Sequence, residues 1–278
     1  MGRLEERFLE RLGAWQVEVE RSFQTEGSMI ALGNRGEQRV VVKVLERGGD
    51  EWNSGAILEA FDGHGMVRVY DYIEGAMLLE RLEPGSLLTG VVLEGADEAA
   101  TEIIADVMQR MTPGNPPPGT PTALDLAKGF AWYRASGDVQ IPRDLFEDAE
   151  RIYLDLAATQ RSVRLIHGDL QHYNVLLDSE RGWLAIDPKG IVAELEYEIG
   201  ASMRNPFELA QIVTAPSVIE RRIRQYTSTL NLDSARVLKW AFSQAVLSAI
   251  WSVEDGYSVR PDSVAITLAY AIAPMLDS

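Results

Sequence analysis

Residues 165–177 read Leu-Ile-His-Gly-Asp-Leu-Gln-His-Tyr-Asn-Val-Leu-Leu, and residues 183–190 follow with Trp-Leu-Ala-Ile-Asp-Pro-Lys-Gly. Asp169, Asn174 and Asp187 stand here at the ends of short apolar runs. Carboxylate and amide oxygens are ligands for Mg²⁺, and a carboxylate can also orient a hydroxyl group and accept its proton. The stretch therefore predicts a site where a magnesium-bound nucleotide meets an acceptor hydroxyl.

The residues before this stretch predict a small lobe that is mostly sheet. Amphipathic periodicity indicates a helix over residues 3–14, and alternating or Val-rich runs indicate strands. The break at Glu83-Pro84-Gly85 places the end of this lobe at residue 82. The predicted strands lie around 17–20, 29–32, 39–45, 66–72 and 76–82, with a second helix over 51–61.

The remainder of the chain, from residue 83 to residue 278, predicts a larger and mostly helical lobe. Residues 113–122 hold five prolines and two glycines, so this segment is predicted to be a loop without regular structure. Helical patterns cover residues 96–111, 144–160, 206–226, 233–253 and 263–273.

Composition limits the classes of partner. The 278 residues carry a net charge of −16, which argues against broad nucleic-acid binding and suits a cationic partner. The chain has no Cys, which excludes disulfides, thiol catalysis and Cys-ligated zinc. The charged start Met1-Gly-Arg has no apolar signal core, and residues 265–276 are too short to span a bilayer. We expect a cytoplasmic protein with no membrane contact, as a monomer or weak dimer.

The motif His167-Gly-Asp-Leu-Gln-His-Tyr-Asn174 with Ile186-Asp187 resembles the aminoglycoside phosphotransferase-like kinases. Four further segments are similar to the branch of streptomycin 6-kinases and hydroxyurea phosphotransferases. The resemblance implies an α+β, protein-kinase-like fold with a small N-terminal antiparallel sheet lobe (1–82) and a larger helical C-terminal lobe (83–278). The segments are 78–85, 184–190, 203–206 and 247–256.

The resemblance also implies roles at the phosphate end of the site. Asp169 is expected to be the catalytic base, and His167 to hold the Asp169 loop through hydrogen bonds to backbone. Asn174 and Asp187 are expected to bind Mg²⁺, with Asp187 bridging it to the phosphates of ATP. Pro188 in place of the protein-kinase Phe predicts a stiff loop after Asp187.

The nucleotide is expected to lie against the N-terminal lobe. Lys43, within Val40-Val-Val-Lys-Val44, is expected to contact the α- and β-phosphates and to pair with an acid on the following helix. Glu51 is the preferred acid and Glu59 the alternative. The sequence leaves open whether the nucleotide is ATP or GTP. The other expected nucleotide-binding residues are Gly27 and Ser28 at the phosphates and the hinge Glu80, Arg81 and Leu82 at the adenine.

The acceptor is expected to be a small cationic molecule, most directly an aminoglycoside of the streptomycin type. Acidic side chains and an aromatic face bind a guanidinium or ammonium group, and Glu254, Asp255, Glu198 and Trp251 are the candidates. Two alternatives stay open. One is a metabolic kinase of the same fold that acts on choline, homoserine, methylthioribose or a sugar. The other is a pseudokinase that binds nucleotide without turnover.

Overall fold

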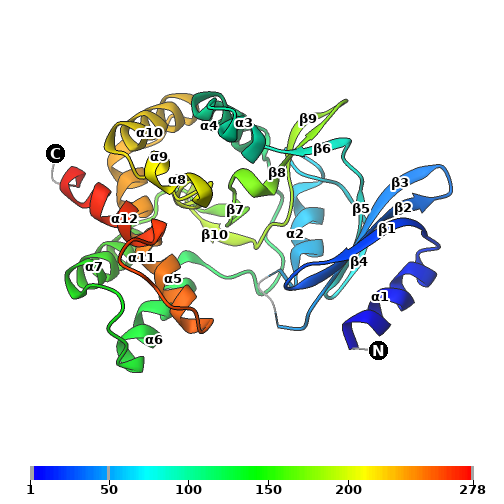
Figure 1. Ribbon diagram of the computed structural model, residues 1–278, viewed down its shortest axis with the longest axis horizontal. Helices are drawn as coiled ribbons and strands as arrows, with labels where there is room; N and C mark the ends of the chain where they lie inside the picture. The colour runs from blue at the N-terminus through cyan, green and yellow to red at the C-terminus, as the bar shows by residue number, and fades with distance from the viewer. Residues whose placement is uncertain (1–2, 49–50, 277–278) are drawn as a thin grey trace.

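A five-stranded antiparallel sheet forms the N-terminal lobe (Figure 1). The computed structural model describes residues 3–48 and 51–276. The strand order is β1–β2–β3–β5–β4, so the Val-rich strand β3 lies at the centre. The strands are β1 (Glu18–Gln24), β2 (Ser28–Arg35), β3 (Gln38–Leu45), β4 (Val69–Ile73) and β5 (Ala76–Glu80).

The period-two alternation of β3 explains where Lys43 points. Val40, Val42 and Val44 are fully buried in a core that includes Phe8 from helix α1 (Arg3–Ala14). Because successive side chains of a strand face opposite sides, Lys43 lies on the other face of the sheet. That face looks toward helix α2 (Ser54–Phe61) and the C-terminal lobe.

The C-terminal lobe surrounds two small sheets with helices (Figure 1). Strands β6, β8 and β9 form one antiparallel sheet, and β10 pairs with β7 in the other. The strands are β6 (Pro84–Leu87), β7 (Arg164–Ile166), β8 (Val175–Asp178), β9 (Gly182–Ala185) and β10 (Ile191–Ala193). The helices are α3 (Thr89–Leu93), α4 (Asp97–Arg110), α5 (Ala123–Leu126), α6 (Lys128–Ser136), α7 (Arg143–Ala158), α8 (Leu195–Met203), α9 (Ala210–Val213), α10 (Pro216–Leu230), α11 (Ser234–Glu254) and α12 (Val264–Ile272).

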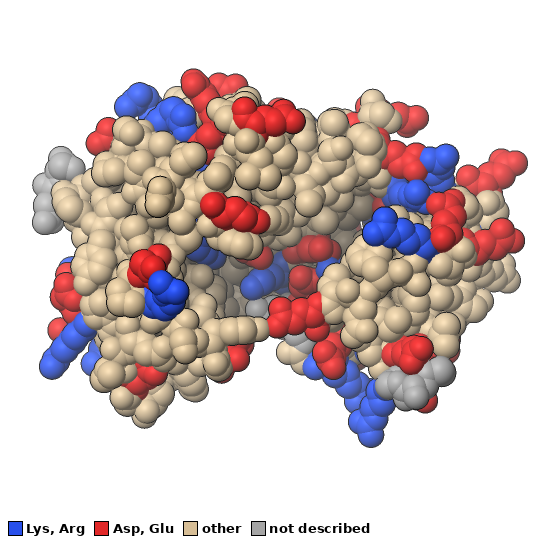
Figure 2. All heavy atoms as spheres, in the orientation of Figure 1, with Lys and Arg blue, Asp and Glu red and all other residues tan. Residues whose placement is uncertain are grey.

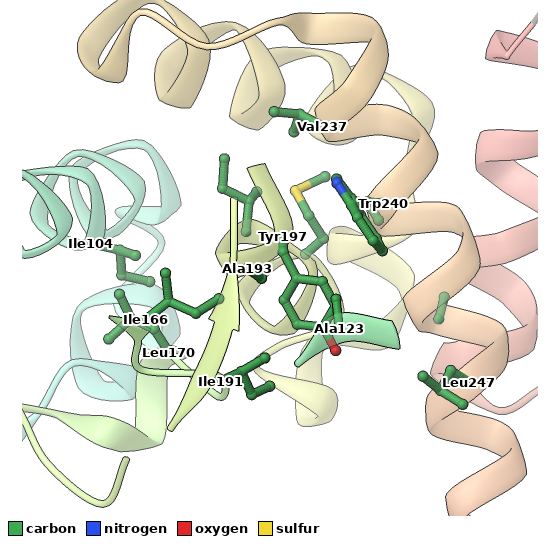
Figure 3. Close-up of a cluster of buried hydrophobic side chains, with 14 of the residues drawn as sticks. Ile104, Ala123, Ile166, Leu170, Ile191, Ala193, Tyr197, Val237, Trp240 and Leu247 are labelled. Carbon is green, nitrogen blue, oxygen red and sulfur yellow. The ribbon is translucent and has the colours of Figure 1, made fainter. Parts of the chain in front are cut away.

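Buried aromatic rings fix the strand that leads into the catalytic loop. Tyr153, Tyr197 and Trp240 meet edge to face, with ring centroids 4.9 to 6.3 Å apart. Figure 3 shows Tyr197 close to Ala193 of β10, with Trp240 on one side of it and Ile166 of β7 on the other; all four side chains are buried. Aromatic contacts of this geometry add to the free energy of burial. The loop that starts at residue 167 is therefore anchored on a rigid core.

The predicted two-lobed α+β fold is confirmed, with local corrections. The expected single helix over 206–226 is wrong, because the chain leaves α9 at Val213 and Pro216 starts α10. Proline has no N–H group for a bond in the helix interior, and it is accepted at a helix start. Helix α2 begins at Ser54 rather than at residue 51.

The lobe boundary between residues 82 and 83 stays a prediction. The pairing of β6 with β8 supports it, because residues after 83 already belong to a sheet of the second lobe. Met1 and Gly2, used above to assess a signal peptide, lie outside the described residues. Over residues 3–48 and 51–276, no helix has the length and apolar character needed to cross a membrane.

Candidate active site

Asp169, Asn174 and the residue before Asp187 are joined by hydrogen bonds. Asn174 Nδ2 donates to the Asp169 carbonyl oxygen at 2.9 Å and lies 3.4 Å from Asp169 Oδ2. The carbonyl oxygen of Asn174 accepts the N–H of Ile186, the residue before Asp187, at 2.9 Å. The predicted base and both predicted metal ligands therefore lie together. Their roles in binding and catalysis stay predictions.

His167 holds the base in place through two hydrogen bonds. Its Nε2 lies 2.8 Å from the Ile186 carbonyl oxygen, and its Nδ1 lies 3.2 Å from the backbone nitrogen of Asp169. Since the Asp169 N–H donates, Nδ1 accepts and Nε2 carries the proton. The expected contacts of His167 with loop backbone are confirmed. Its role in catalysis stays a prediction.

Glu198 supports the same loop from below, which corrects its predicted role. Its carboxylate accepts N–H groups from Gly168 at 3.0 Å and from Leu170 at 3.2 Å, on either side of Asp169. The side chain is 2% exposed, and it does not line a cavity that could take an acceptor. Burial raises the pKa of Glu198, and the hydrogen bonds from the backbone of the loop act against this rise. The prediction that Glu198 binds substrate is wrong.

Lys43 forms a buried ion cluster with two acids. Its Nζ lies 2.7 Å from Asp187 Oδ1 and also bonds the Glu51 carboxylate. Burial acts to lower the pKa of Lys43, but Asp187 and Glu51 outweigh it and raise the pKa above its usual value. Glu51 is therefore confirmed as the partner, from the turn before α2 rather than from the helix. Glu59 accepts a hydrogen bond from Tyr72 Oη instead.

The segment from Asp187 to Gly190 is fixed at several points. Asp187 has φ = 56°, an uncommon backbone conformation for a residue with a side chain. The Ser54 hydroxyl donates to the Pro188 carbonyl oxygen at 2.6 Å, and the Gly190 N–H donates to the His167 carbonyl oxygen at 2.9 Å. Helix α2 of the first lobe is thereby joined to the Asp187–Gly190 segment of the second.

An apolar cavity of about 470 Å³ lies between the lobes on one side of this segment. Lys43 and Asp187 lie at its polar end, and Leu82 lines it together with the hinge. An apolar cavity with charged groups on its lining suits a nucleotide base and its phosphates. The remaining apolar lining includes Phe23, Ile30, Leu32, Val41, Leu79, Leu176 and Ile186.

The hinge side chains have structural partners. Glu80 is 9% exposed, accepts the Arg68 N–H at 2.8 Å and pairs with Arg181 from the β8–β9 turn. Arg181 also donates to the Gly63 carbonyl oxygen at 2.5 Å, so it ties the second lobe to the first. Arg81 donates to Glu20 at 2.6 Å. Adenine recognition by the hinge backbone stays a prediction.

The turn at Gly27 and Ser28 does not match the expected phosphate contact in full. The Ser28 N–H donates to Thr25 Oγ1 at 3.0 Å, so it is already bonded within the turn, and Ser28 is 3% exposed. The expectation for Ser28 is therefore wrong. Gly27 has open space around its α-carbon, and its role stays a prediction.

A second cavity, of about 640 Å³, lies on the other side of the Asp187–Gly190 segment. Trp251, Glu254 and Asp255 at the end of α11 line it. Their binding of an acceptor stays a prediction. Figure 2 shows acidic and basic side chains within the hollow between the lobes. The proline-rich segment forms another wall through Pro117, Pro118, Thr120 and Pro121.

The side chains of Asp187 and Asn174 have the chemistry that suits magnesium. Within residues 3–48 and 51–276, no group of three or more His, Asp or Glu side chains gathers as a site built from protein alone. Mg²⁺ is commonly held by one or two carboxylates together with substrate phosphates and water. Asp187 and Asn174 offer oxygens that fit such a site, and Asp187 lines the 470 Å³ cavity. Their binding of Mg²⁺ stays a prediction.

Sequence reasoning missed several residues of this region. Arg181 follows a surface turn in the sequence, and nothing in its local pattern indicates its contact with Glu80. Lys189 and Lys128 line the second cavity, although only the first belongs to a quoted motif. Lys189 had a signal, since it stands two residues after a predicted metal ligand.

The fold and this site together define an ATP-dependent phosphotransferase with a protein-kinase-like architecture. The family model for aminoglycoside/hydroxyurea antibiotic resistance kinases matches residues 14–256. The chain belongs to that family.

Named relatives agree with this assignment. A streptomycin 3''-kinase of Klebsiella pneumoniae is 30% identical over 237 residues, covering 84% of this chain and 86% of that protein. A streptomycin 6-kinase of Streptomyces glaucescens is 30% identical over 275 residues, covering 95% and 87%. A solved thermostable mutant of an aminoglycoside phosphotransferase, in ternary complex with AMP-PNP and hygromycin B, has a TM-score of 0.64 at 15% identity. That alignment covers 99% of this chain and 98% of the solved one, and it supports the fold.

Proposed function

We propose that this protein transfers the γ-phosphoryl group of ATP, with Mg²⁺, to a hydroxyl group of a small cationic aminoglycoside of the streptomycin type. The observation that carries the proposal is the meeting of Asp169, Asn174, Asp187 and Lys43 between two cavities. One cavity is apolar and suits a nucleotide. The other is lined by acids and an indole ring and suits a cation.

Each residue has a defined task in this proposal. Lys43 neutralises charge on the α- and β-phosphates, and Asp187 and Asn174 would hold Mg²⁺. Asp169 orients the acceptor hydroxyl and takes its proton as the new P–O bond forms, while ADP leaves with the old bridging oxygen. His167 and Glu198 keep the Asp169 loop in register, which matters because small displacements at the reacting atoms are costly.

Phosphate transfer to streptomycin, followed by mass spectrometry of the product, tests the proposal. We expect a gain of one phosphoryl group with the wild-type protein. Asp169→Ala should lower kcat on the order of 10²-fold or more while nucleotide binding is retained. Full activity of Asp169→Ala would remove the proposed base.

A second candidate acceptor is hydroxyurea, because the family's name joins the two substrates. Hydroxyurea is small and uncharged, so it has no use for the acids Glu254 and Asp255. Parallel assays with both compounds separate the candidates. Glu254→Gln combined with Asp255→Asn should weaken transfer to streptomycin only, and an equal effect on hydroxyurea would favour a structural role for the two acids.

A further inference from the structure

Lys189 and Trp251 meet inside the acceptor cavity. Lys189 Nζ lies 5.8 Å from the centroid of the Trp251 ring. Both residues line the cavity, Lys189 from the segment after Asp187 and Trp251 from the last turn of α11. An ammonium group within about 6 Å of an indole face is attracted by the negative charge density of the ring. The ring face that a cationic acceptor can use thus already carries a cation from the protein.

The backbone is held on both sides of Lys189. The Pro188 carbonyl oxygen accepts the Ser54 hydroxyl, and the Gly190 N–H donates to the His167 carbonyl oxygen. Gly190 packs so closely on α2 that an added β-carbon would lie 2.4 Å from Ile57 Cδ1. Four methylene groups separate the ammonium from this fixed backbone. A change in the position of the ammonium therefore needs no shift of the backbone that carries Asp187.

Acidic side chains line the same cavity. Glu74, Glu254 and Asp255 attract any incoming cation. A cationic acceptor is therefore drawn into the cavity in which the Trp251 ring lies.

We propose that the Lys189 ammonium occupies the face of Trp251 that a cationic group of the acceptor takes, so that acceptor binding displaces it from the ring. This inference rests on the proposed function and adds a selectivity element to it. A cationic acceptor must compete with Lys189 for the ring, whereas a neutral acceptor need not displace the lysine.

Substitution of Lys189 by Met also makes the cavity more negative, so the test must separate ring competition from general attraction. Lys128 lines the same cavity and provides the matched control. Streptomycin dissociation constants are measured by calorimetry for Lys189→Met and Lys128→Met. Each substitution is made in the wild-type background and in the Trp251→Leu background. Lys189→Gln is made in parallel in case the Met variant does not fold.

Competition predicts that Lys189→Met tightens streptomycin binding about two- to fivefold. The gain should vanish in the Trp251→Leu background, while any effect of Lys128→Met should be the same in both backgrounds. Equal gains for the two lysines that do not depend on Trp251 would overturn the inference. An unchanged or weaker affinity of Lys189→Met would overturn it as well.

A small guanidinium probe keeps the inference testable if streptomycin is not the acceptor. Agmatine is titrated while the indole N–H signal of Trp251 is followed by NMR, assigned by its loss in Trp251→Leu. If the wild type binds no streptomycin, and Lys189→Met binds agmatine more tightly than the wild type does, the proposed acceptor is contradicted and the competition for the ring is supported. If the Trp251 signal responds to agmatine equally in the wild type and in Lys189→Met, the competition for the ring is contradicted and the proposed acceptor is not affected.

Discussion

Arg222 is fully buried and pairs with Asp97, so helix α10 is joined to the first turn of helix α4. Arg222 Nε lies 3.1 Å from Asp97 Oδ2, and the same guanidinium donates to the carbonyl oxygens of Ser202 at 2.8 Å and Asn205 at 3.0 Å. These carbonyls belong to the end of α8 and the turn after it. The helix that carries Glu198 is thus held at one end by Arg222.

Arg222→Met should destabilise the protein strongly. Removal of one partner of a buried pair leaves the other charge without compensation, which costs on the order of 3 kcal/mol. Arg221 also contacts Asp97 and softens the loss. Urea unfolding measures the change. The control Arg143→Met removes an arginine of an exposed i,i+4 pair, and its change in the free energy of unfolding should lie within experimental error. A similar small effect for Arg222→Met would show that its network contributes little.

Glu198→Gln should lower kcat on the order of 10- to 100-fold and leave the affinity for nucleotide unchanged. The amide oxygen can replace Oε1, which accepts the N–H groups of Gly168 and Leu170, but the NH₂ group then replaces Oε2 and faces the Gly168 N–H at 3.2 Å, so the loop around Asp169 shifts. Steady-state kinetics and a binding titration with AMP-PNP separate the two parameters. Glu196→Gln, on the same helix and only half-buried, is the control. Equal kcat values for the wild type and Glu198→Gln would remove the positioning role.

His172 should make the protein less stable in mild acid. Burial, followed by the charge of Arg222, lowers the pKa of His172 to about 3. The unfolded chain binds a proton near pH 6.5 while the folded chain stays neutral. This contribution to stability is therefore complete above pH 6.5 and is lost as the pH falls from 6.5 toward 3, by at most about 1.4 kcal/mol per pH unit.

His172→Leu tests this by urea unfolding at several pH values between 7.5 and 5. Neither ring nitrogen of His172 has a hydrogen-bond partner within residues 3–48 and 51–276, so little is lost at neutral pH. The variant should show a shallower fall of the unfolding free energy below pH 6.5. His64→Gln, at an exposed position, should keep the wild-type slope. A His172→Leu slope identical to that of the wild type would count against the buried neutral imidazole.

Magnesium removal should abolish stabilisation by ATP. At a ligand concentration 100 times the dissociation constant, binding adds about 2.7 kcal/mol to the free energy of unfolding. We expect ATP with Mg²⁺ to raise the Tm of the wild type, and EDTA or Asp187→Asn to suppress most of the rise. Asp106→Asn, at an exposed position of α4, is the control. A full Tm rise in Asp187→Asn would mean that Mg²⁺ is held by other groups.

The sequence by itself determined the parts that depend on local pattern. The alternation around Lys43 places its side chain on one face of a strand, because strand geometry repeats every two residues. The spacing of Asp169, Asn174 and Asp187 within one loop and one hairpin brings them together, because few residues separate them. The proline-rich segment 113–122 is irregular as predicted, since proline cannot continue a helix.

Only the tertiary structure decided which distant side chains meet. The sequence favours Glu51 over Glu59 as the partner of Lys43 without excluding Glu59, and the ion pair of Lys43 with Glu51 decides between them. Glu198 has a carboxylate that could bind a cationic ligand, yet the packing of α8 under the catalytic loop directs this carboxylate to backbone N–H groups. Arg181 and Lys189 gain their contacts through the same approach of segments far apart in the chain. Such contacts follow from how helices and strands pack in three dimensions, and no local period records them.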